Sequence, residues 1–356
     1  MYEILNAVYP YITGLYTLPW ILVGFLLTII IAQITSRKKI DTLMKKIGLI
    51  LLYFFIPVLI FRIFLNTDFG AQQIEFALIV SIIVILMYLL AYTYARITVK
   101  KLDLKGPKKQ LYLNTALTNQ GRSSAFIGGA LLTSTWSVEA AIYIALVGIG
   151  LFAVIPYILS YIHKKESHQQ KKAENVKGLP WYLKLYPWYL ISFVVAGIAL
   201  HSFTGQNSLT LLGENTNTLL KFYTAITIPA ALYYVGASIH PSDLKKTELK
   251  KLFGFEKAGE NEDHWLWVRK MFFLASLLTP LLTLAFIGPI FFLGYIPNAW
   301  FAVIIINSIL PITSTNMFLI PYGIDKKSTA HVVTWTTLIC VPIVVALIML
   351  LGIYIP

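Results

Sequence analysis

The chain has 356 residues, of which 57% are hydrophobic and 13% are charged, and its formal net charge is +13. A single soluble core cannot bury that much apolar surface, so the composition indicates a membrane protein. The basic residues are divided among short loops rather than gathered on one face, which argues against nucleic acid and favours anionic lipid headgroups as their partner. The single cysteine, Cys340, rules out a cysteine-rich metal site.

Apolar stretches of about the length that a bilayer span requires, roughly 20 residues, follow one another along the whole chain. They predict an all-α polytopic membrane protein without a sizeable soluble domain. The first stretch has the acidic Glu3 and no small-residue cleavage site, so we expect it to belong to the mature protein. We expect helices at residues 14–34, 47–65, 74–97, 111–133, 138–162, 186–203, 217–240, 267–293, 298–320 and 330–353.

The positions of Lys and Arg predict the orientation in the membrane. All of them except Arg62, Arg122 and Lys221 lie in or beside the loops after the first, third, fifth, seventh and ninth predicted helices. Loops rich in Lys and Arg remain on the cytoplasmic side, so both termini are predicted to be extracytoplasmic. We expect a multi-pass protein of the plasma membrane. The lack of a long central loop is more typical of a prokaryotic than of a plant protein.

Arg122 is the unusual charge, because it lies about halfway along the predicted helix 111–133. A guanidinium at that depth costs roughly 2.5–3.5 kcal/mol on insertion scales. Arg62 and Lys221 lie near helix ends, where long side chains reach the interface. No Asp or Glu lies at mid-depth in the ten predicted helices, so we expect the partner of Arg122 to be an anion from outside the protein. The alternative is that Arg122 caps backbone carbonyl groups.

An inverted repeat of five plus five helices would place both termini on the same side of the membrane. Helices two and seven carry "FFIPVLIF" (54–61) and "ITIPAALY" (226–233), each with Ile-Pro in mid-helix. Helices four and nine carry "LTNQGRSS" (117–124) and "ITSTNMFL" (312–319), which share Thr-Asn. Inverted repeats are typical of secondary transporters, whose sites lie near the midplane on interrupted helices.

Helices four and nine are predicted to be interrupted, at Gly121 and at Pro311. Proline lacks a donor and displaces the carbonyl four residues earlier, and the freed groups require polar surroundings. The start of a half-helix attracts anions, and Arg122 adds a planar fork that suits a carboxylate. The alternative is that these polar side chains only join helices. The candidate substrate-binding residues are Asn119, Gln120, Gly121, Arg122, Ser123, Ser124, Thr313, Ser314, Thr315 and Asn316.

Several stretches resemble the auxin efflux carrier family, which includes plant auxin exporters and bacterial organic-acid permeases, within the wider group of bile acid, arsenite and riboflavin transporter-like proteins. The likeness follows the whole chain in order. Where family members commonly have Asn-Thr-Gly followed by a proline, this chain has Asn-Gln-Gly and then Phe126. The stretches are "LYFFIPVLIF" (52–61), "NQG" (119–121), "YVGASIHP" (234–241), "SILPITSTNMFLIPYG" (308–323) and "VTWTTLICVPIV" (333–344).

The resemblance implies a first repeat at 1–162, a cytoplasmic linker at 163–185 and a second repeat at 186–356. It further implies a scaffold of helices one, two, six and seven, and a mobile transport domain of helices three to five and eight to ten. Helices four and nine would cross at their breaks. By match to the motifs, the crossing is assigned to Asn119, Gly121, Pro311 and Asn316.

These features predict a secondary carrier that moves a small organic anion, a carboxylate, by elevator-type alternating access. The alternative is a ligand-sensing receptor or channel on the same scaffold. An enzyme is not expected, because the sequence has no His-Glu-x-x-His pattern and no paired aspartates in a helix. We expect membrane lipids and a second copy, bound through the scaffold, as further partners. No cofactor is expected; a coupling ion, Na+ or H+, is left open, with Asn114, Asn307 and His331 as candidate residues.

Overall fold

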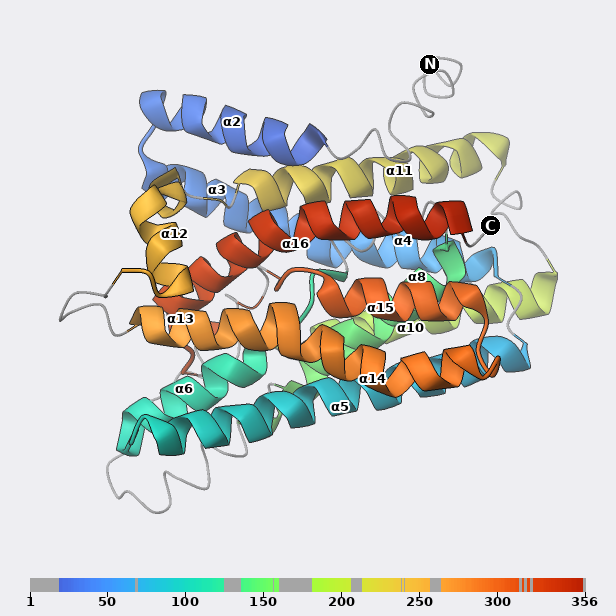
Figure 1. Cartoon of the computed structure of the whole chain (residues 1–356). Helices are drawn as coiled ribbons and strands as arrows, with labels where there is room; N and C mark the ends of the chain where they lie inside the picture. Colours follow the sequence, from blue (N-terminus) through green and yellow to red (C-terminus); the bar gives the residue numbers. More distant parts are fainter. Residues whose placement is uncertain are drawn as a thin grey trace.

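In the computed structural model, helices are the regular secondary structure of the described residues, apart from one isolated β-bridge. The helices lie side by side along one common direction, with α12 (Lys246–Phe253) across one end (Figure 1). The all-helical fold class predicted from the apolar stretches is therefore confirmed for the described residues. The structure describes residues 19–67, 70–124, 136–155, 157–159, 181–205, 213–237, 239, 241–256, 264–313, 316, 319–320 and 323–354.

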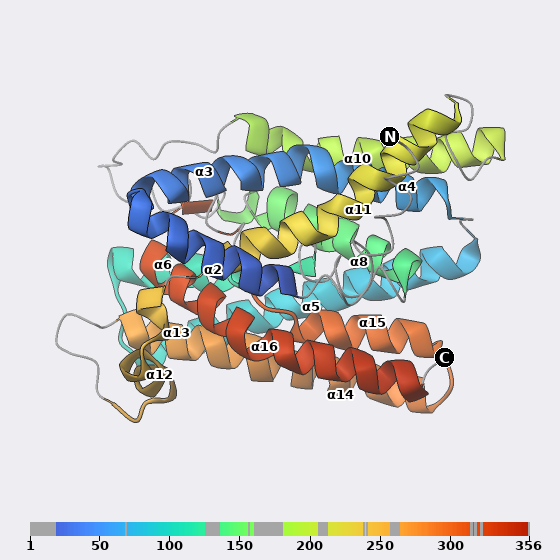
Figure 2. The same ribbon diagram turned by 90° about the horizontal axis from the view of Figure 1, so that it is seen from above.

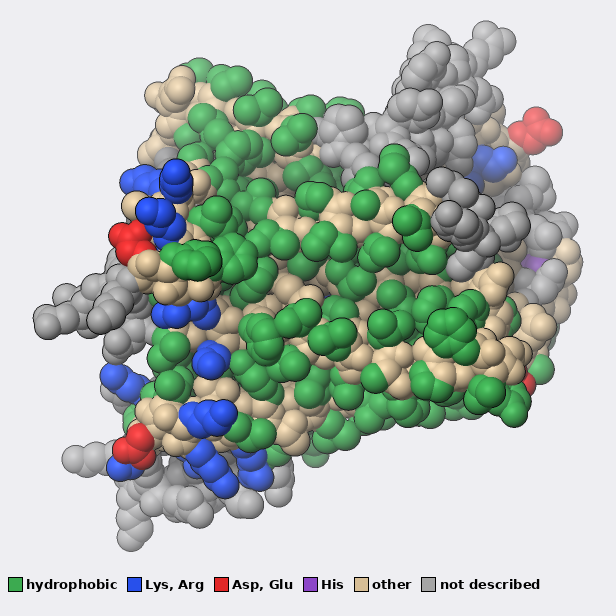
Figure 3. All heavy atoms as spheres, in the orientation of Figure 1, with side chains coloured by type: hydrophobic (Ala, Val, Ile, Leu, Met, Phe, Trp, Pro, Cys, Tyr) green, Lys and Arg blue, Asp and Glu red, His purple; other side chains and the backbone are tan. Residues whose placement is uncertain are grey.

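Each of the ten predicted helices overlaps a helix of the structure. In the part of the chain that the structure describes, five helices are long and apolar enough on their own to cross a membrane: Lys39–Leu65, Ala71–Lys101, Glu214–Ala237, His264–Phe292 and Lys326–Leu351. Four shorter apolar helices accompany them: Trp20–Ile34, Ser137–Ile149, Trp188–Thr204 and Asn298–Ile309. Hydrophobic side chains cover the middle of the surface, and Lys and Arg gather at the end where α12 lies (Figure 3). The chain is thus a multi-pass membrane protein.

The helices in chain order have the following bounds: α2 (Pro19–Ile34), α3 (Arg37–Ile50), η2 (Leu51–Phe55), α4 (Ile56–Leu65), α5 (Ala71–Lys101), α6 (Gly106–Thr118), α8 (Ser137–Ile149), η4 (Gly150–Val154), α10 (Trp181–Thr204), α11 (Glu214–Ala237), η6 (Pro241–Leu244), α12, α13 (His264–Phe273), η7 (Leu274–Leu278), α14 (Thr279–Phe292), α15 (Asn298–Ile309) and α16 (Lys326–Tyr354).

Two predicted boundaries differ from the structure. The second helix begins at Arg37 rather than at residue 47, because Ile40 and Met44 bury their side chains one turn apart and extend it into the basic loop. The predicted linker 163–185 lies outside the described residues up to 180, and 181–185 already belong to α10. A further short helix, α12, follows α11 in the loop before α13.

The helices form two groups. α2 packs along α11 and α4 packs along α10, whereas α5, α6, α13, α14, α15 and α16 pack with one another, and α8 contacts both groups (Figure 2). Glycines allow the close approach in the first group. A Cβ on Gly236 would lie 1.8 Å from the carbonyl oxygen of Ile21, and one on Gly24 would lie 2.2 Å from that of Tyr233.

Prolines explain two of the wide π-helical turns. Pro57 and Pro280 follow η2 and η7 within two residues. A proline inside a helix removes one donor and pushes an earlier carbonyl away, and a π turn accommodates this. In the first case the Tyr53 carbonyl oxygen accepts a hydrogen bond from the Tyr189 hydroxyl, 2.8 Å away on α10. The π turn before Pro57 is therefore joined to a neighbouring helix.

Candidate functional site at the helix crossing

The helices that were predicted to be interrupted both end within their polar stretches. α6 ends at Thr118, three residues before Gly121, and α15 ends at Ile309, two residues before Pro311. Leu310 has an extended backbone, with φ −49° and ψ 145°. The ring of a proline disfavours the helical conformation for the residue before it. The sequence Leu-Pro therefore ends α15.

The two interrupted segments lie against each other as a short antiparallel pair, with a β-bridge between Arg122 and Ile312. The Ser123 amide donates to the Pro311 carbonyl oxygen at 2.8 Å, and the Thr313 amide donates to the Gly121 carbonyl oxygen at 2.9 Å. The Ile312 amide donates to the Thr336 hydroxyl of α16 at 3.1 Å. Irregular backbone at membrane depth is tolerated only where such partners exist. Each of the two segments thus provides hydrogen-bond partners for backbone groups of the other.

Gly121 lets the two segments approach. A Cβ at this position would lie 2.7 Å from a Leu151 methyl carbon and 2.8 Å from the Asn316 side-chain oxygen. Both neighbours are buried, with 2% of Leu151 and none of Asn316 exposed. The side chain of Asn316, from the second break, therefore lies directly against the backbone of the first.

Arg122 lies in the β-bridge at the crossing, directly after the predicted break at Gly121, and not inside a helix. The reason is that α6 has already ended and the backbone of this segment pairs across the crossing. Only 2% of Arg122 is exposed. Its guanidinium donates to the Ala275 carbonyl oxygen at 3.0 Å, to Gln120 Oε1 at 3.3 Å and to the Leu310 carbonyl oxygen at 3.4 Å.

Both carbonyl groups are available to Arg122 for local reasons. Leu310 follows the last residue of α15, where carbonyl groups lack helical partners. In the π turn η7 each amide bonds five residues back, and the residue five after Ala275 is Pro280, which has no N–H. Arg122 thus acts as a cap on carbonyl groups, the alternative that the sequence left open.

The positive charge of Arg122 is nevertheless not matched by a carboxylate among the described residues. The titratable side chains near it, Cys340, Tyr143 and Tyr88, are uncharged at neutral pH. Its Nε–H has no acceptor among the described residues. A guanidinium has five N–H donors, so the cap does not exhaust its capacity to bind an anion.

Several further buried polar atoms at the crossing have no hydrogen-bond partner among the described residues. An unsatisfied buried donor or acceptor costs about 1–3 kcal/mol, so such a cluster indicates a place where a polar ligand is accommodated. The Asn119 side-chain nitrogen donates to Met271 Sδ at 3.1 Å, whereas its side-chain oxygen has no donor among the described residues. The atoms are Thr118 Oγ1, Asn119 Oδ1, Gln120 Nε2, Ser123 Oγ, and Asn316 Oδ1 and Nδ2.

Other candidate residues hold the crossing together. The Ser124 hydroxyl donates to Asn307 Oδ1 at 2.9 Å, and Asn307 Nδ2 donates to the Val303 carbonyl oxygen at 2.8 Å. Asn114 Nδ2 donates to the Gly323 carbonyl oxygen at 3.3 Å and so ties α6 to the chain before α16. Ser314 and Thr315 lie outside the described residues.

His331 is in the second turn of α16 and does not line the cavity at the crossing. Its Nδ1 lies 2.8 Å from the Lys327 carbonyl oxygen, and its ring packs on Trp265 with centroids 4.8 Å apart. No group of three or more His, Cys, Asp or Glu residues that could hold a metal occurs in the described part of the chain.

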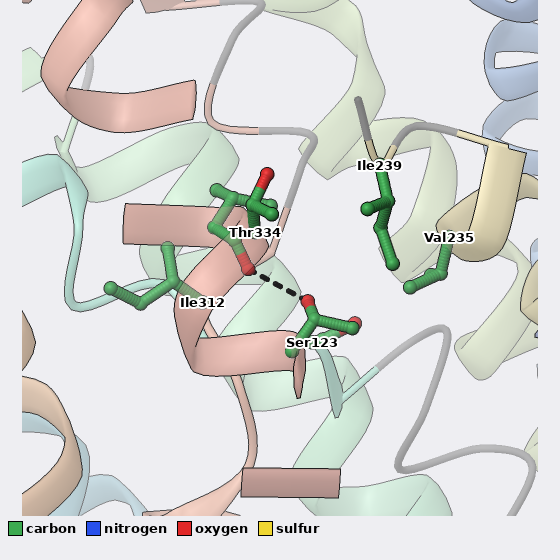
Figure 4. A pocket seen from close by; sticks show the side chains of 7 residues that line it. Ser123, Val235, Ile239, Ile312 and Thr334 are labelled. Carbon is green, nitrogen blue, oxygen red and sulfur yellow. Dashed lines mark hydrogen bonds between the residues drawn. The ribbon is translucent and has the colours of Figure 1, made fainter. Parts of the chain in front are cut away.

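A small cavity lies between the crossing and α11. Val235 and Ile239 face Ser123, Ile312 and Thr334 across it (Figure 4). Val333 and Thr337 of α16 complete the lining, and the volume is about 10 Å³. That is about the space of one water molecule. A metabolite enters only if α11 and the crossing move apart.

The sequence analysis missed the two threonines of this cavity as site residues. Thr334 and Thr337 are three positions apart on a helix and therefore share one face. The run "VTWTT" (333–337) held that signal. The apolar wall of Val235 and Ile239 has no such signal, because nothing local distinguishes those residues from any lipid-facing or core residue.

The fold and the crossing define a helical multi-pass membrane protein in which α6 and α15 end beside each other. Residues 125–135, the rest of the predicted helix 111–133 and the turn after it, lie outside the described residues. The chain matches the family model Conserved hypothetical protein 698 over residues 63–254, more than half of its length. It therefore belongs to that family of conserved membrane proteins, which is compatible with a transporter-like role. None of the curated proteins compared with the chain matches it.

The family match supports membership of a family of conserved membrane proteins, but not specifically of the auxin efflux carrier family that the sequence resembles. It begins in α4 and ends just after α12, so it includes Arg122 and α11 but not the break at Pro311. The match by itself does not identify organic anions or auxin as substrates.

Proposed function

We propose that this protein is a secondary carrier for small organic anions with a carboxylate group, and that the substrate binds between the helix crossing and α11. The observation that carries the proposal is the crossing itself. Two interrupted helices place a buried guanidinium beside several buried polar atoms that have no protein partner among the described residues. Interrupted helices at membrane depth are typical of substrate sites in secondary transporters.

The chemistry of the crossing favours an anion over a cation. Arg122 brings a formal charge that carbonyl dipoles compensate only in part. Ser123, next to it, lines the cavity together with Thr334 and Thr337. Hydroxyl groups donate to carboxylate oxygens. The apolar wall of Val235 and Ile239 suits a substrate with a hydrocarbon part.

Alternating access would move the two groups of helices against each other. In this proposal α2, α4, α10 and α11 form the scaffold, and α5, α6, α8, α13, α14, α15 and α16 form the transport domain. An inverted repeat is supported by two matched pairings: α2 packs on α11 and α10 packs on α4. In each pairing a glycine, Gly24 or Gly197, faces a carbonyl of the partner helix. The narrow cavity corresponds to a closed state.

The test is counterflow of labelled malate, malonate, lactate and indole-3-acetate in proteoliposomes. We expect saturable exchange of at least one of these acids by the wild type. In Ser123→Ala and Thr334→Val the half-saturating concentration should rise about tenfold or more, because a hydrogen bond to a charged group contributes about 1.5–3 kcal/mol. Thr283→Val is the matched control, since this buried hydroxyl on α14 bonds to the Thr279 carbonyl oxygen away from the cavity.

The outcomes separate the alternatives. Exchange that is unchanged in Ser123→Ala and Thr334→Val would place the substrate elsewhere. Saturable binding of an acid without exchange of label would favour a ligand-sensing receptor, because a receptor need not return its ligand to the other side. Neither exchange nor binding of any of the four acids would contradict the proposed substrate class.

A further inference from the structure

A second and larger cavity lies away from the crossing, in a groove between α4, α5, α8 and α10. Its volume is about 340 Å³. The lining residues are Phe64, Gln73, Ile74, Ala77, Leu78, Ser81, Ile142, Ala145, Leu146, Ile149, Leu190, Ile191, Val194 and Ile198. Twelve of these fourteen are apolar. The groove is therefore suited to a hydrocarbon ligand.

The two polar side chains of the lining already form hydrogen bonds within the protein, so an occupant of the groove need not supply partners for them. The Ser81 hydroxyl donates to the Ala77 carbonyl oxygen of its own helix at 2.7 Å. Gln73 Oε1 accepts a hydrogen bond from the Gly70 amide at 2.8 Å at the start of α5. A space of this size equals about ten water volumes, but water needs two to four polar partners, and apolar cavities stay dry. Water is therefore a poor occupant.

The groove opens toward the surface that meets the bilayer. Ile74 and Leu78, one turn apart on α5, are 59% and 60% exposed although they lie within a predicted membrane span. The medium in contact with such side chains in a membrane is lipid hydrocarbon. An acyl chain thus reaches the groove directly, without leaving the bilayer.

The length of the groove corresponds to one leaflet. It follows α5 from Gln73 to Ser81 and α10 from Leu190 to Ile198, a rise of eight residue steps in each case, or about 12 Å at 1.5 Å per residue. Half of the hydrocarbon core of a bilayer is about 15 Å thick. The groove lies in the half of α5 that is far from Lys100 and Lys101, at the end opposite α12 (Figure 1).

We propose that this groove binds one acyl chain of a phospholipid from the leaflet opposite the basic loops. The acyl chain lies between α4 and α10 on one side and α5 and α8 on the other, and the headgroup of the phospholipid lies near the start of α5. This inference rests on the groove alone and does not require that the protein be an anion carrier.

The test uses the full chain in liposomes with a phosphatidylcholine that carries a diazirine in its acyl chain. One sample is irradiated directly, and a second is extracted into lipid-free detergent and washed by size exclusion before irradiation. Labelled peptides are then mapped by mass spectrometry. We expect the washed sample to keep its label on residues 73–81 and 190–198 while it loses the label from the exposed face of α14.

Ala77→Phe fills the groove from α5, and Val194→Trp fills it from the facing wall on α10. Each variant should lower the retained label about tenfold, the effect of excluding roughly two methylene groups. The matched control is Ala285→Phe on the exposed face of α14, which should leave the retained label unchanged.

Three results would overturn the proposal. Washing could remove the label equally from the groove and from α14, which would mean ordinary lipid contact. Both filling variants could retain as much label as the wild type while remaining folded. Crosslinks between two protein chains at Ile74 or Leu78, with no retained lipid, would show that a second copy covers this face.

Discussion

Replacement of Gly121 by alanine measures how closely the two interrupted helices approach. The new Cβ would lie 2.7 Å from Leu151 Cδ1 and 2.8 Å from Asn316 Oδ1, well inside ordinary van der Waals contact. Both side chains are buried and have little room to turn away. Overpacking of this kind costs about 1–3 kcal/mol, so we expect Gly121→Ala to lower the free energy of unfolding by that amount.

The matched control is Gly288→Ala in α14, another buried glycine. There the new Cβ would lie 3.7 Å from Leu284 Cδ1, an ordinary contact, and alanine in a helix interior gains about 0.5–1 kcal/mol over glycine. Both variants can be compared with the wild type by denaturant titration in detergent micelles. Equal stability of Gly121→Ala and Gly288→Ala would refute the close approach of Gly121, Leu151 and Asn316.

Three further substitutions test the account. Tyr189→Phe removes the hydrogen bond to the carbonyl of Tyr53 and should cost about 1 kcal/mol in the same titration, whereas Tyr157→Phe, at a residue that is 75% exposed, should cost nothing. Arg122→Lys keeps the charge but cannot span acceptors on Gln120, Ala275 and Leu310, so a thermal unfolding midpoint as high as that of the wild type would count against the capping role. Gly236→Leu should separate α2 from α11 and prevent stable folding, because even a Cβ meets the Ile21 carbonyl oxygen at 1.8 Å; normal yield of folded protein would contradict that packing.

The points at which α6 and α15 end could be predicted from the sequence because their causes are local. Pro311 removes a donor and extends Leu310, and polar residues flank both breaks. The mid-depth position of Arg122 drew attention to it for a similar reason, since charges in spans are expensive. These features needed no knowledge of how distant segments pack.

The partners of Arg122 could not be predicted, because they depend on contacts between residues far apart in the sequence. The Ala275 carbonyl lies 153 residues away and is accessible only because a π turn precedes Pro280. The pairing of Arg122 with Ile312 likewise joins segments on different helices. Local patterns gave the positions of the breaks, whereas the cap on the carbonyl groups required the packed structure.

The most direct test of the proposed substrate site uses a single cysteine at its centre. In a Cys340→Ser background, Ser123→Cys places a thiol in the cavity between α11 and the crossing. The rate of its modification by a charged methanethiosulfonate reagent is measured with and without an acid that the wild type exchanges. The account predicts that the acid slows modification in proportion to its occupancy and that modification stops exchange. Equal modification rates, or full exchange by the modified protein, would contradict a substrate site at the crossing.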